Sequence, residues 1–395
     1  MPAAALKAEI QEDLQPHRAR VIYFGHDRTD RKVTQRINGL AALGFDVVAL
    51  TFHREKYDRD HRPTWFNIDL GRTVDYGYAQ RLFGVASAAW RVWRCRRQLQ
   101  AAGFVIARNI DMVVLALFAR WVARCRAPLA YEVLDVHRFF IGDSLLNRLF
   151  RELERYALAR SDLLLVSSPA YIRHYFEPMQ RYRGQWFLLE NKVSAGRLRR
   201  PSARRPPQSP GDRWVIGWCG TLRCVRSLEL LIEIARYNRD RVTVYMRGFP
   251  TETGLEVFER SIASEPNMIY GGGYRSPDDL TEVYGKIDIN WCLDFYDERK
   301  NSLWLLPNRL YEGGFFNTPA LGLAGTETAR KIADAGLGWV LDEPVADSAG
   351  QFLAELTPDA YASRVAHLET LPDHVFADSG DLARLGRILL DCGHR

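Results

Sequence analysis

Short apolar runs, each closed by a glycine or a polar residue, alternate with helix-forming segments through most of the 395 residues. The first unit of this alternation is an apolar run at 20–24, then Gly25, a helical segment at 33–43 and a second apolar run at 45–52. A strand, a helix and a strand in this order form a right-handed crossover, which makes the two strands parallel neighbours in one sheet. The sequence therefore predicts an α/β protein built on open parallel sheets.

The alternation occurs twice, on either side of a segment rich in Pro, Arg and Ser at 197–213, which is predicted to be a linker or exposed loop. A chain of this length also exceeds what one hydrophobic core usually accommodates. We therefore expect an N-terminal Rossmann-like domain at 18–196, a linker at 197–213, a C-terminal Rossmann-like domain at 214–345 and a helical tail at 346–395.

Basic residues are concentrated in the first half of the chain. Residues 1–200 hold 33 Lys and Arg against 20 Asp and Glu, whereas the remainder holds 21 against 28. The basic half is expected to face an anion, and phospholipid headgroups, a lipid-linked diphosphate or nucleic acid would each qualify. A basic amphipathic segment at 78–100 carries Trp90 and Trp93, a composition typical of a helix at a membrane interface, although a helix on a domain surface would also fit.

The six cysteines are scattered without metal-binding spacing, so they are predicted to be reduced thiols in a cytoplasmic protein without a metal site. The first residues carry acids and lack the apolar core of a signal peptide. No run approaches the roughly twenty apolar residues that a membrane span needs.

Polar residues follow two predicted strands of the N-terminal half. Gly25, His26 and Asp27 come directly after the first strand, where open parallel sheets bind ligands, although His26 and Asp27 could instead cap the next helix. Asp135 and His137 follow the strand at 129–133, and both can transfer protons. A helix cap remains the alternative for Asp135.

The C-terminal half offers candidate anion-binding residues. Arg223 and Arg226 stand in the turn between the strand at 214–220 and the next helix, where guanidinium groups and helix N–H groups could hold a diphosphate. A later strand closes on three consecutive glycines at 271–273, which let the backbone approach a flat ligand, and Tyr274 offers a stacking surface. No phosphate-loop or dinucleotide-binding glycine pattern occurs in the sequence.

The stretch NSLWLLPNRLYEGGFFNTP at 301–319 combines a helix start at Pro307 with a single acid, Glu312. Asn308, Arg309 and Glu312 would cluster near the helix N-terminus, which attracts anions, while the carboxylate could accept hydrogen bonds from a sugar diol. The segment is therefore predicted to bind a nucleotide or, alternatively, to be an ordinary packed helix.

Four segments in a fixed order resemble the nucleotide-sugar domain of family 4-type glycosyltransferases of the GT-B fold: GTLR after a strand, NMIYGGGYRSPDDLTEVYGKIDI, PNRLYEGGFFNTPAL and ARKIADAGLGWVLD. The N-terminal segments YFGHD and YEVLDVH are similar to those of bacterial exopolysaccharide transferases of the succinoglycan and xanthan kind. The resemblance covers most of residues 20–345. It implies two Rossmann-like domains that face a cleft, with C-terminal helices able to cross back to the N-terminal domain.

The resemblance also implies roles for individual residues. Glu312 would hold the donor ribose, Arg223 with Arg226 the diphosphate, and Asp135, beside His137, would serve as the general base of an inverting reaction. The remaining residues expected on the donor side are Arg247, Tyr274, Asn301, Ser302, Asn308 and Arg309, and those expected on the acceptor side are Gly25, His26 and Asp27. Retaining members commonly carry a second glutamate eight positions before the ribose glutamate, where this chain has Trp304.

The expected function is transfer of a sugar from a nucleoside-diphosphate sugar to a polyprenyl-diphosphate-linked oligosaccharide. A UDP-sugar is the expected donor. The chain would act in exopolysaccharide biosynthesis, peripherally on the cytoplasmic face of the inner membrane, with no cofactor, metal or nucleic acid. Two alternatives stay open: a UDP-sugar epimerase of the same fold, and a basic nucleic-acid-binding protein, which would leave the glycine-loop αβ series without a purpose.

Overall fold

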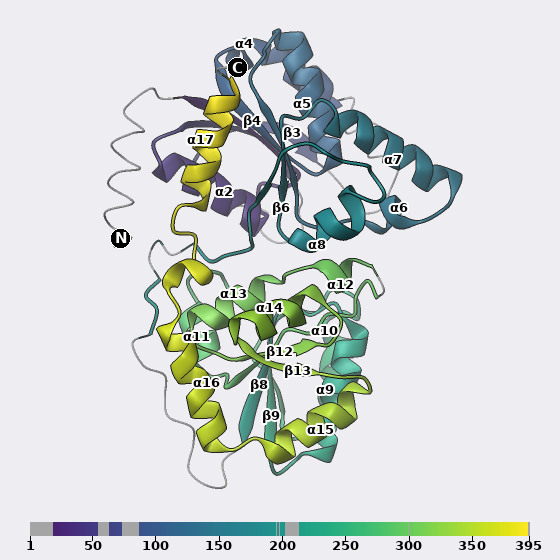
Figure 1. The fold of residues 1–395 in the computed structure, drawn as a ribbon, viewed down its shortest axis with the longest axis vertical. Coiled ribbons are helices and arrows are strands. Elements are labelled where there is room, and N and C mark those ends of the chain that lie inside the picture. The colour runs from purple at the N-terminus through teal and green to yellow at the C-terminus, as the bar shows by residue number, and fades with distance from the viewer. Residues whose placement is uncertain are drawn as a thin grey trace. The chain divides into compact units, whose positions relative to one another are not determined.

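The computed structural model describes residues 19–53, 63–72, 87–194, 196, 198–201, 213–298 and 300–393 (Figure 1). The chain forms two compact units: Met1–Leu189 together with Gly380–Arg395, called unit 1, and Glu190–Ser379, called unit 2. The division falls at Leu189, before the expected linker at 197–213, because described residues soon after Leu189 already make contacts within unit 2. Asn191, for example, donates to the carbonyl of Leu306 at 3.1 Å, and Val193 pairs with Ala377. Most of the expected linker lies outside the described residues.

The sheet of unit 1 is parallel throughout, with the strand order β3-β2-β1-β4-β5-β6-β7. Its central strands consist mainly of buried apolar residues because helices cover both faces, as is usual for parallel sheets. The strands are β1 (Arg20–Gly25), β2 (Asp46–His53), β3 (Phe66–Arg72), β4 (Ala102–Arg108), β5 (Leu129–Val133), β6 (Leu163–Val166) and β7 (Trp186–Leu188).

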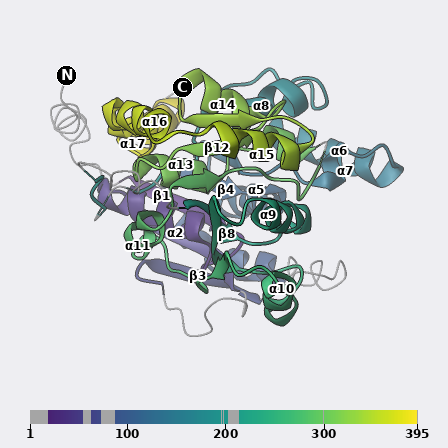
Figure 2. The same ribbon diagram turned by 90° about the horizontal axis from the view of Figure 1, so that it is seen from below.

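The helices of unit 1 are α2 (Arg31–Ala42), a helical segment at 87–94, α4 (Arg96–Leu99), α5 (Ile110–Ala123), α6 (Arg138–Ile141), α7 (Leu145–Leu158) and α8 (Pro169–Tyr171), which continues into a π-helical turn (Ile172–Phe176). The segment expected to form one helix at 78–100 is divided by a turn at Cys95, and its residues 78–86 lie outside the described part of the chain. Figures 1 and 2 both show α6 and α7 projecting away from the strands of unit 1.

The last helix, α17 (Asp381–Gly393), belongs to unit 1 although the whole of unit 2 precedes it in the chain. It packs against α2 and β4 and places Leu382, Leu385 and Leu389 in the same apolar cluster as Val21 and Ile37. The expectation that C-terminal helices cross back to the N-terminal domain is thereby confirmed for α17. The expected tail at 346–395 is divided, because residues up to Ser379 remain with unit 2.

The sheet of unit 2 is also parallel, with the order β10-β9-β8-β11-β12-β13. Its strands are β8 (Trp214–Thr221), β9 (Val242–Phe249), β10 (Met268–Tyr270), β11 (Ile289–Trp291), β12 (Ala320–Leu323) and β13 (Gly338–Leu341). Its helices are α9 (Val225–Tyr237), α10 (Leu255–Ile262), α11 (Leu280–Gly285), α12 (Asn301–Trp304), α13 (Asn308–Phe315), α14 (Glu327–Ala335), α15 (Val345–Glu355) and α16 (Pro358–Thr370), and a 3-10 turn covers Asp373–Val375. The two apolar clusters of this unit contain large buried side chains such as Trp218, Trp291 and Tyr311. The predicted α/β class with two Rossmann-like domains is confirmed.

Candidate active site

The strand order of unit 2 reverses at β8, which has β9 on one side and β11 on the other. In open parallel sheets, ligands bind beyond the carboxyl ends of the strands at such a reversal. The loops that follow β8, β9, β10 and β11 all lie at this edge because the strands are parallel. Arg223 and Tyr274 lie in these loops, and most of the other residues predicted to bind the donor lie on the helices that follow them.

Arg223 joins the loops after β8 and β11. Its guanidinium carbon lies 4.3 Å from the centroid of the Tyr296 ring, a cation–π contact that holds the charge beside the reversal point. Arg226, in the first turn of α9, instead pairs with Glu298 and Glu343 at 2.7 Å each, and its hydrogen bond to Glu298 raises its pKa. Since two carboxylates already balance Arg226, Arg223 is the better candidate to receive a diphosphate.

Arg247 is buried at the end of β9 and supports the glycine loop at 271–273. Its Nη2 donates to the carbonyl of Gly273 at 3.2 Å, and its Nη1 donates to Tyr245 at 3.0 Å. A Cβ on Gly271 would lie 2.6 Å from Cδ of Arg247, so the loop fits closely over this side chain. Arg247 therefore shapes the loop, while Tyr274, directly after it, is partly buried against the neighbouring apolar cluster.

Glu312 lies on α13, which begins directly after Pro307 as the sequence predicts. Its side chain is buried, and the hydroxyl of Tyr284 donates to its Oε2 at 3.1 Å. Added Cβ atoms at Gly313 and Gly314 would lie 2.3 Å from Asn290 and 2.1 Å from Phe376. The helix is thus closely packed and also carries a buried carboxylate at the edge of the sheet where ligands are expected.

Arg309 and Ser302 meet at Asp294, a residue that the sequence reasoning missed. The hydroxyl of Ser302 donates to Oδ1 of Asp294 at 2.6 Å, and Arg309 lies 3.7 Å from Oδ2 while it donates to the carbonyl of Leu293 at 2.8 Å. Asp294 lies in the loop that follows β11, and a polar residue in a loop after a parallel strand was the sequence signal that could have identified it. Asn301 and Ser302 are both buried on α12, and Asn308 opens α13.

Trp304, at the position of the second glutamate of retaining relatives, ends α12. Residues 305–307 separate it from α13, so Trp304 and Glu312 lie on different helices.

In unit 1, the loop after β1 is organised by two aspartates. Asp27 is buried and accepts hydrogen bonds from N and Oγ1 of Thr29, both at 2.9 Å. The N-cap of α2 is Asp30, whose side chain accepts from the amides of Lys32 and Val33, so the alternative in which His26 and Asp27 cap this helix is wrong. Asp30 suits the cap better because it stands one residue before the helix and can reach its first free amides.

His26 lies beside the same cap, with Nε2 3.6 Å from Oδ2 of Asp30. Arg108 donates to Asp30 at 2.7 Å. Burial opposes ionisation of this carboxyl, but the charge of Arg108 lowers its pKa well below the ordinary value. The loop after β1 is therefore held by a partly buried ion pair.

Asp135 is exposed in the loop after β5. The N-cap of the following helix is His137, whose Nδ1 accepts from the amide of Phe139 at 3.4 Å and whose ring stacks on Phe139 at 4.7 Å, so the alternative of Asp135 as the cap is wrong. Only β4 separates β1 from β5, and two strand spacings amount to about 10 Å. The structure therefore places Gly25, His26 and Asp27 at the same sheet edge as Asp135.

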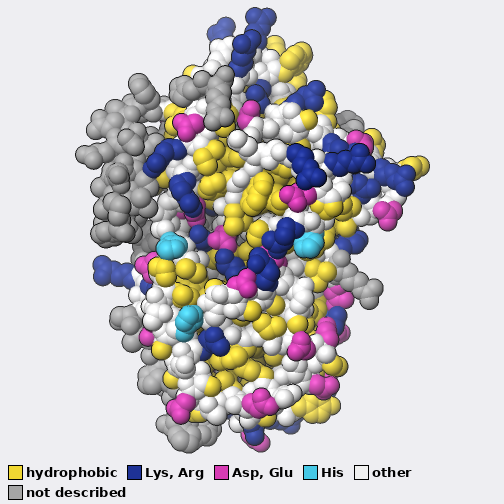
Figure 3. Space-filling model, viewed as in Figure 1, with side chains coloured by type: hydrophobic (Ala, Val, Ile, Leu, Met, Phe, Trp, Pro, Cys, Tyr) yellow, Lys and Arg dark blue, Asp and Glu magenta, His cyan; other side chains and the backbone are white. Residues whose placement is uncertain are grey.

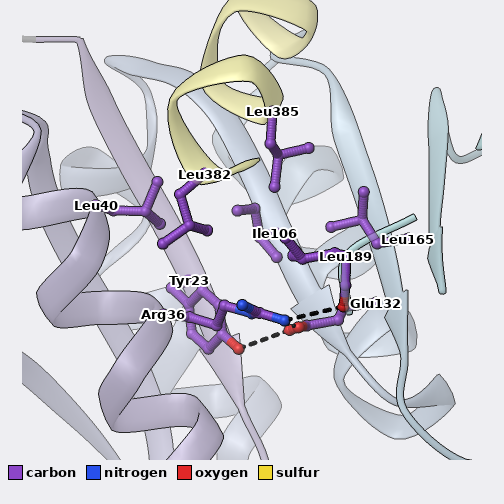
Figure 4. A pocket seen from close by; sticks show the side chains of 9 residues that line it. All are labelled: Tyr23, Arg36, Leu40, Ile106, Glu132, Leu165, Leu189, Leu382 and Leu385. Carbon is purple, nitrogen blue, oxygen red and sulfur yellow. Dashed lines mark hydrogen bonds and ion pairs between the residues drawn. The ribbon is translucent and has the colours of Figure 1, made fainter. Parts of the chain in front are cut away.

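A network of buried polar groups lies within unit 1, around a small pocket that leucines of α17 help to line (Figure 4). Glu132 accepts from the Tyr23 hydroxyl at 2.8 Å and from Nε of Arg36 at 3.0 Å, and Arg36 also donates to the carbonyl of Leu189 at 3.2 Å. Burial opposes ionisation of Glu132, but Arg36 and then Arg108 lower its pKa. No short sequence pattern signals this network, because each member lies on a different element.

Among the described residues, no group of three or more His, Cys, Asp or Glu side chains could hold a metal ion. Within the same residues, no helix is both long and apolar enough to span a membrane.

Comparison with known proteins shows the class to which this chain belongs. Residues 30–192 match the glycosyl transferase 4-like domain. The chain is also 37% identical over 347 residues to the succinoglycan biosynthesis protein ExoL of Rhizobium meliloti (strain 1021), and the match covers 87% of this chain and 86% of that protein. The chain therefore belongs to the GT-B glycosyltransferases of the exopolysaccharide group.

Solved structures support the same fold. Sucrose-phosphate synthase from Thermosynechococcus elongatus matches with a TM-score of 0.70 and 12% identity, over 94% of this chain and 98% of that one. The Alr3699/HepE protein of Anabaena, solved in complex with UDP-glucose, matches with a TM-score of 0.67 and 12% identity, over 94% and 99%. The predicted GT-B fold and the glycosyltransferase class are thus confirmed.

Proposed function

We propose that the chain transfers a sugar from a UDP-sugar to a polyprenyl-diphosphate-linked oligosaccharide during exopolysaccharide biosynthesis, working peripherally on the cytoplasmic face of the inner membrane. Unit 2 would bind the donor and unit 1 the acceptor. The observation that carries the donor assignment is the buried Glu312 carboxylate at the same edge of unit 2 as Arg223.

Glu312 would accept hydrogen bonds from the two ribose hydroxyls, and its burial strengthens such bonds. Arg223 would compensate the charge that develops on the departing diphosphate, with free N–H groups at the start of α9 adding to the field. Arg309 and Ser302, which Asp294 holds, would line the same site. The succinoglycan role that the relative's name states, and the UDP-glucose bound to the Anabaena protein, agree with this choice of pathway and donor.

Asp135 would act as the general base that takes the proton of the acceptor hydroxyl as this hydroxyl attacks the anomeric carbon. The residue is exposed, so an acceptor can reach it, and it stands at the same sheet edge as His26 and Asp27. His137 would keep the loop in place through its cap on α6. Attack from the face opposite the diphosphate inverts the anomeric centre, which agrees with Trp304 in place of a second glutamate.

The donor assignment is tested by titration calorimetry with UDP, GDP and ADP on the parent and on Glu312→Gln. Loss of charge-assisted hydrogen bonds to ribose should weaken UDP binding by about 10- to 100-fold. A matched control is Glu265→Gln, because Glu265 is a buried carboxylate of the same unit that precedes β10 at the opposite edge and pairs with Arg236 and Arg239. Equal UDP affinity in the parent and Glu312→Gln would remove the ribose role.

The base is tested by incorporation of labelled sugar from UDP-sugars into a lipid extract of exopolysaccharide-producing cells. Asp135→Asn should retain UDP affinity and lose transfer by at least about 100-fold, whereas Asp143→Asn, another exposed aspartate of unit 1, should remain active. Full transfer by Asp135→Asn would eliminate it as the base. Release of UDP from the parent without any acceptor requirement would favour the epimerase.

A further inference from the structure

Helix α7 turns apolar side chains toward solvent. Four leucines and a tyrosine of this helix are exposed, in fractions that range from 40% for Leu153 to 82% for Leu145. Four of these five positions follow the spacing of a single helix face, and the fifth, Leu146, flanks them. We call this surface the leucine face: Leu145, Leu146, Leu149, Leu153 and Tyr156.

The opposite side of α7 contains a buried carboxylate, which fixes the rotation of the helix. Glu154 is buried and accepts hydrogen bonds from Tyr131 at 2.8 Å, from Tyr175 and from Gln180. Burial raises its pKa. Rotation of the leucines into unit 1 would break these bonds, so the leucine face stays outward. This is the reverse of an ordinary surface helix, in which the apolar side faces the core.

Arginines surround the leucine face. Arg148 is exposed on α7, the Arg160 guanidinium lies over the Tyr156 ring, and Arg155 pairs with Glu152 and donates to the carbonyl of Met179 at 3.1 Å. Figure 3 shows Lys and Arg side chains gathered over α6 and α7, with hydrophobic side chains beside them. An apolar face bordered by arginines is the composition of a helix that lies in the surface of an anionic membrane.

The adjoining helix α5 adds a further exposed aromatic side chain. Trp121 is 75% exposed, and its neighbour Arg120 donates to the carbonyl of Arg160 at 3.3 Å, so the ends of α5 and α7 lie side by side. Arg124 and Arg126 follow Trp121 and are exposed. Tryptophan favours the headgroup region of a bilayer, where its ring is apolar and its N–H can still be hydrated.

We propose that the leucine face docks on an anionic lipid bilayer, with the leucines among the acyl chains and the arginines at the phosphates. The proposal rests on the proposed function only for the expectation that a membrane is present where the enzyme acts. A second copy of the chain is a poorer occupant, because pairing this face with itself would bring like charges together. Trp90 and Trp93 do not belong to this face, because they lie on the helical segment at 87–94 and not on α7.

The test is co-sedimentation with vesicles of phosphatidylcholine alone and with about 30% phosphatidylglycerol, without donor or acceptor. Leu149→Gln with Leu153→Gln should reduce partitioning to the anionic vesicles by roughly tenfold or more, because each exposed leucine is lost as an insertion site. The matched control is Leu255→Gln with Val257→Gln, which removes two comparably exposed apolar side chains from α10 of unit 2. This control should bind as the parent does.

Arg148→Gln is expected to weaken binding to anionic vesicles by about fivefold and to leave the weaker binding to neutral vesicles unchanged. Unchanged sedimentation of the leucine variant would overturn the proposal. So would a loss confined to Trp90→Ala with Trp93→Ala, or light scattering that shows a dimer dissociated by the leucine variant while vesicle binding persists. Because no substrate is present, failure here leaves the transferase assignment intact, and failure of the UDP titration leaves the vesicle result intact.

Discussion

The buried pair of Arg36 and Glu132 offers a quantitative test of what stabilises unit 1. Their side chains are only 3% and 2% exposed, and Nε of Arg36 lies 3.0 Å from Oε1 of Glu132. Glu132→Gln would remove the negative charge and leave the guanidinium buried without it. Breaking a buried pair in this way costs about 3–5 kcal/mol.

This cost is measurable by hydrogen exchange with mass spectrometry, which reports each unit separately. Since about 1.36 kcal/mol corresponds to a factor of ten, protection of β1 and β5 amides should fall by roughly two to nearly four orders of magnitude. Amides of β8 and β9, in unit 2, should keep their protection and provide an internal control.

A double variant separates the loss of the pair from the loss of one charge. Arg36→Met with Glu132→Leu removes both charges and replaces them with apolar side chains, so it should recover most of the protection lost in Glu132→Gln. Unchanged protection of unit 1 in Glu132→Gln would refute the reasoning. An equal loss in the single and double variants would refute it as well.

The pair also predicts a pH dependence. The folded-state pKa of Glu132 lies below its ordinary value of 4.5, so its stabilising contribution is fully present above that value and is lost as the pH falls through the folded-state pKa. The stability difference between the parent and Glu132→Gln should therefore narrow in acid. A constant difference from neutral pH down to about pH 3 would contradict the assignment.

Two further predictions concern other parts of the fold. The raised pKa of Glu154 means that the folded state loses stability as the pH rises from the ordinary glutamate value of 4.5 toward the folded-state pKa. Glu154→Gln should therefore gain thermal stability relative to the parent between about pH 4.5 and pH 7, as measured by calorimetry. A gain that does not depend on pH would contradict this prediction. Gly248 has φ +139°, and a Cβ there would lie 1.7 Å from the carbonyl oxygen of Gly220. Gly248→Ala should therefore destabilise unit 2 by more than about 3 kcal/mol in hydrogen exchange, while unit 1 keeps its protection. Normal protection of the β9 amides would show that β8 and β9 can move apart without loss of stability.

The central strands and helices were predictable because buried elements consist largely of apolar residues, which form recognisable runs in the sequence. The strand predicted at 129–133 coincides with β5, and the helix predicted after Pro307 coincides with α13. The edge strands show a weaker apolar pattern in the sequence. Strand β3 exposes Phe66 and includes Gly71, so it lacks a continuous apolar run, and β7 has only three residues, which are too few to predict a strand.

The sequence predicted which loops contain the candidate site residues, but not which side chains those residues contact. Parallel strands bring all their following loops to one edge, so the position of Asp135 follows from topology. The ion pairs of Arg226 could not be predicted in this way, because its partners Glu298 and Glu343 are 72 and 117 residues away in the chain. The leucine face was also missed, because an amphipathic pattern does not reveal which side of a helix faces the core, and here the buried Glu154 reverses the usual orientation.

The position of α17 has a consequence for the order in which the units can form during synthesis. Unit 2 is one continuous stretch, 190–379, and every residue of its core has been made before α17 is translated. Unit 1 is begun first but lacks Leu382, Leu385 and Leu389 until nearly two hundred further residues have been added. The residues that fold into unit 2 are therefore all synthesised before unit 1 is complete. Until then unit 1 exposes the apolar surface that α17 covers, and it is the part of a nascent chain that a chaperone would hold.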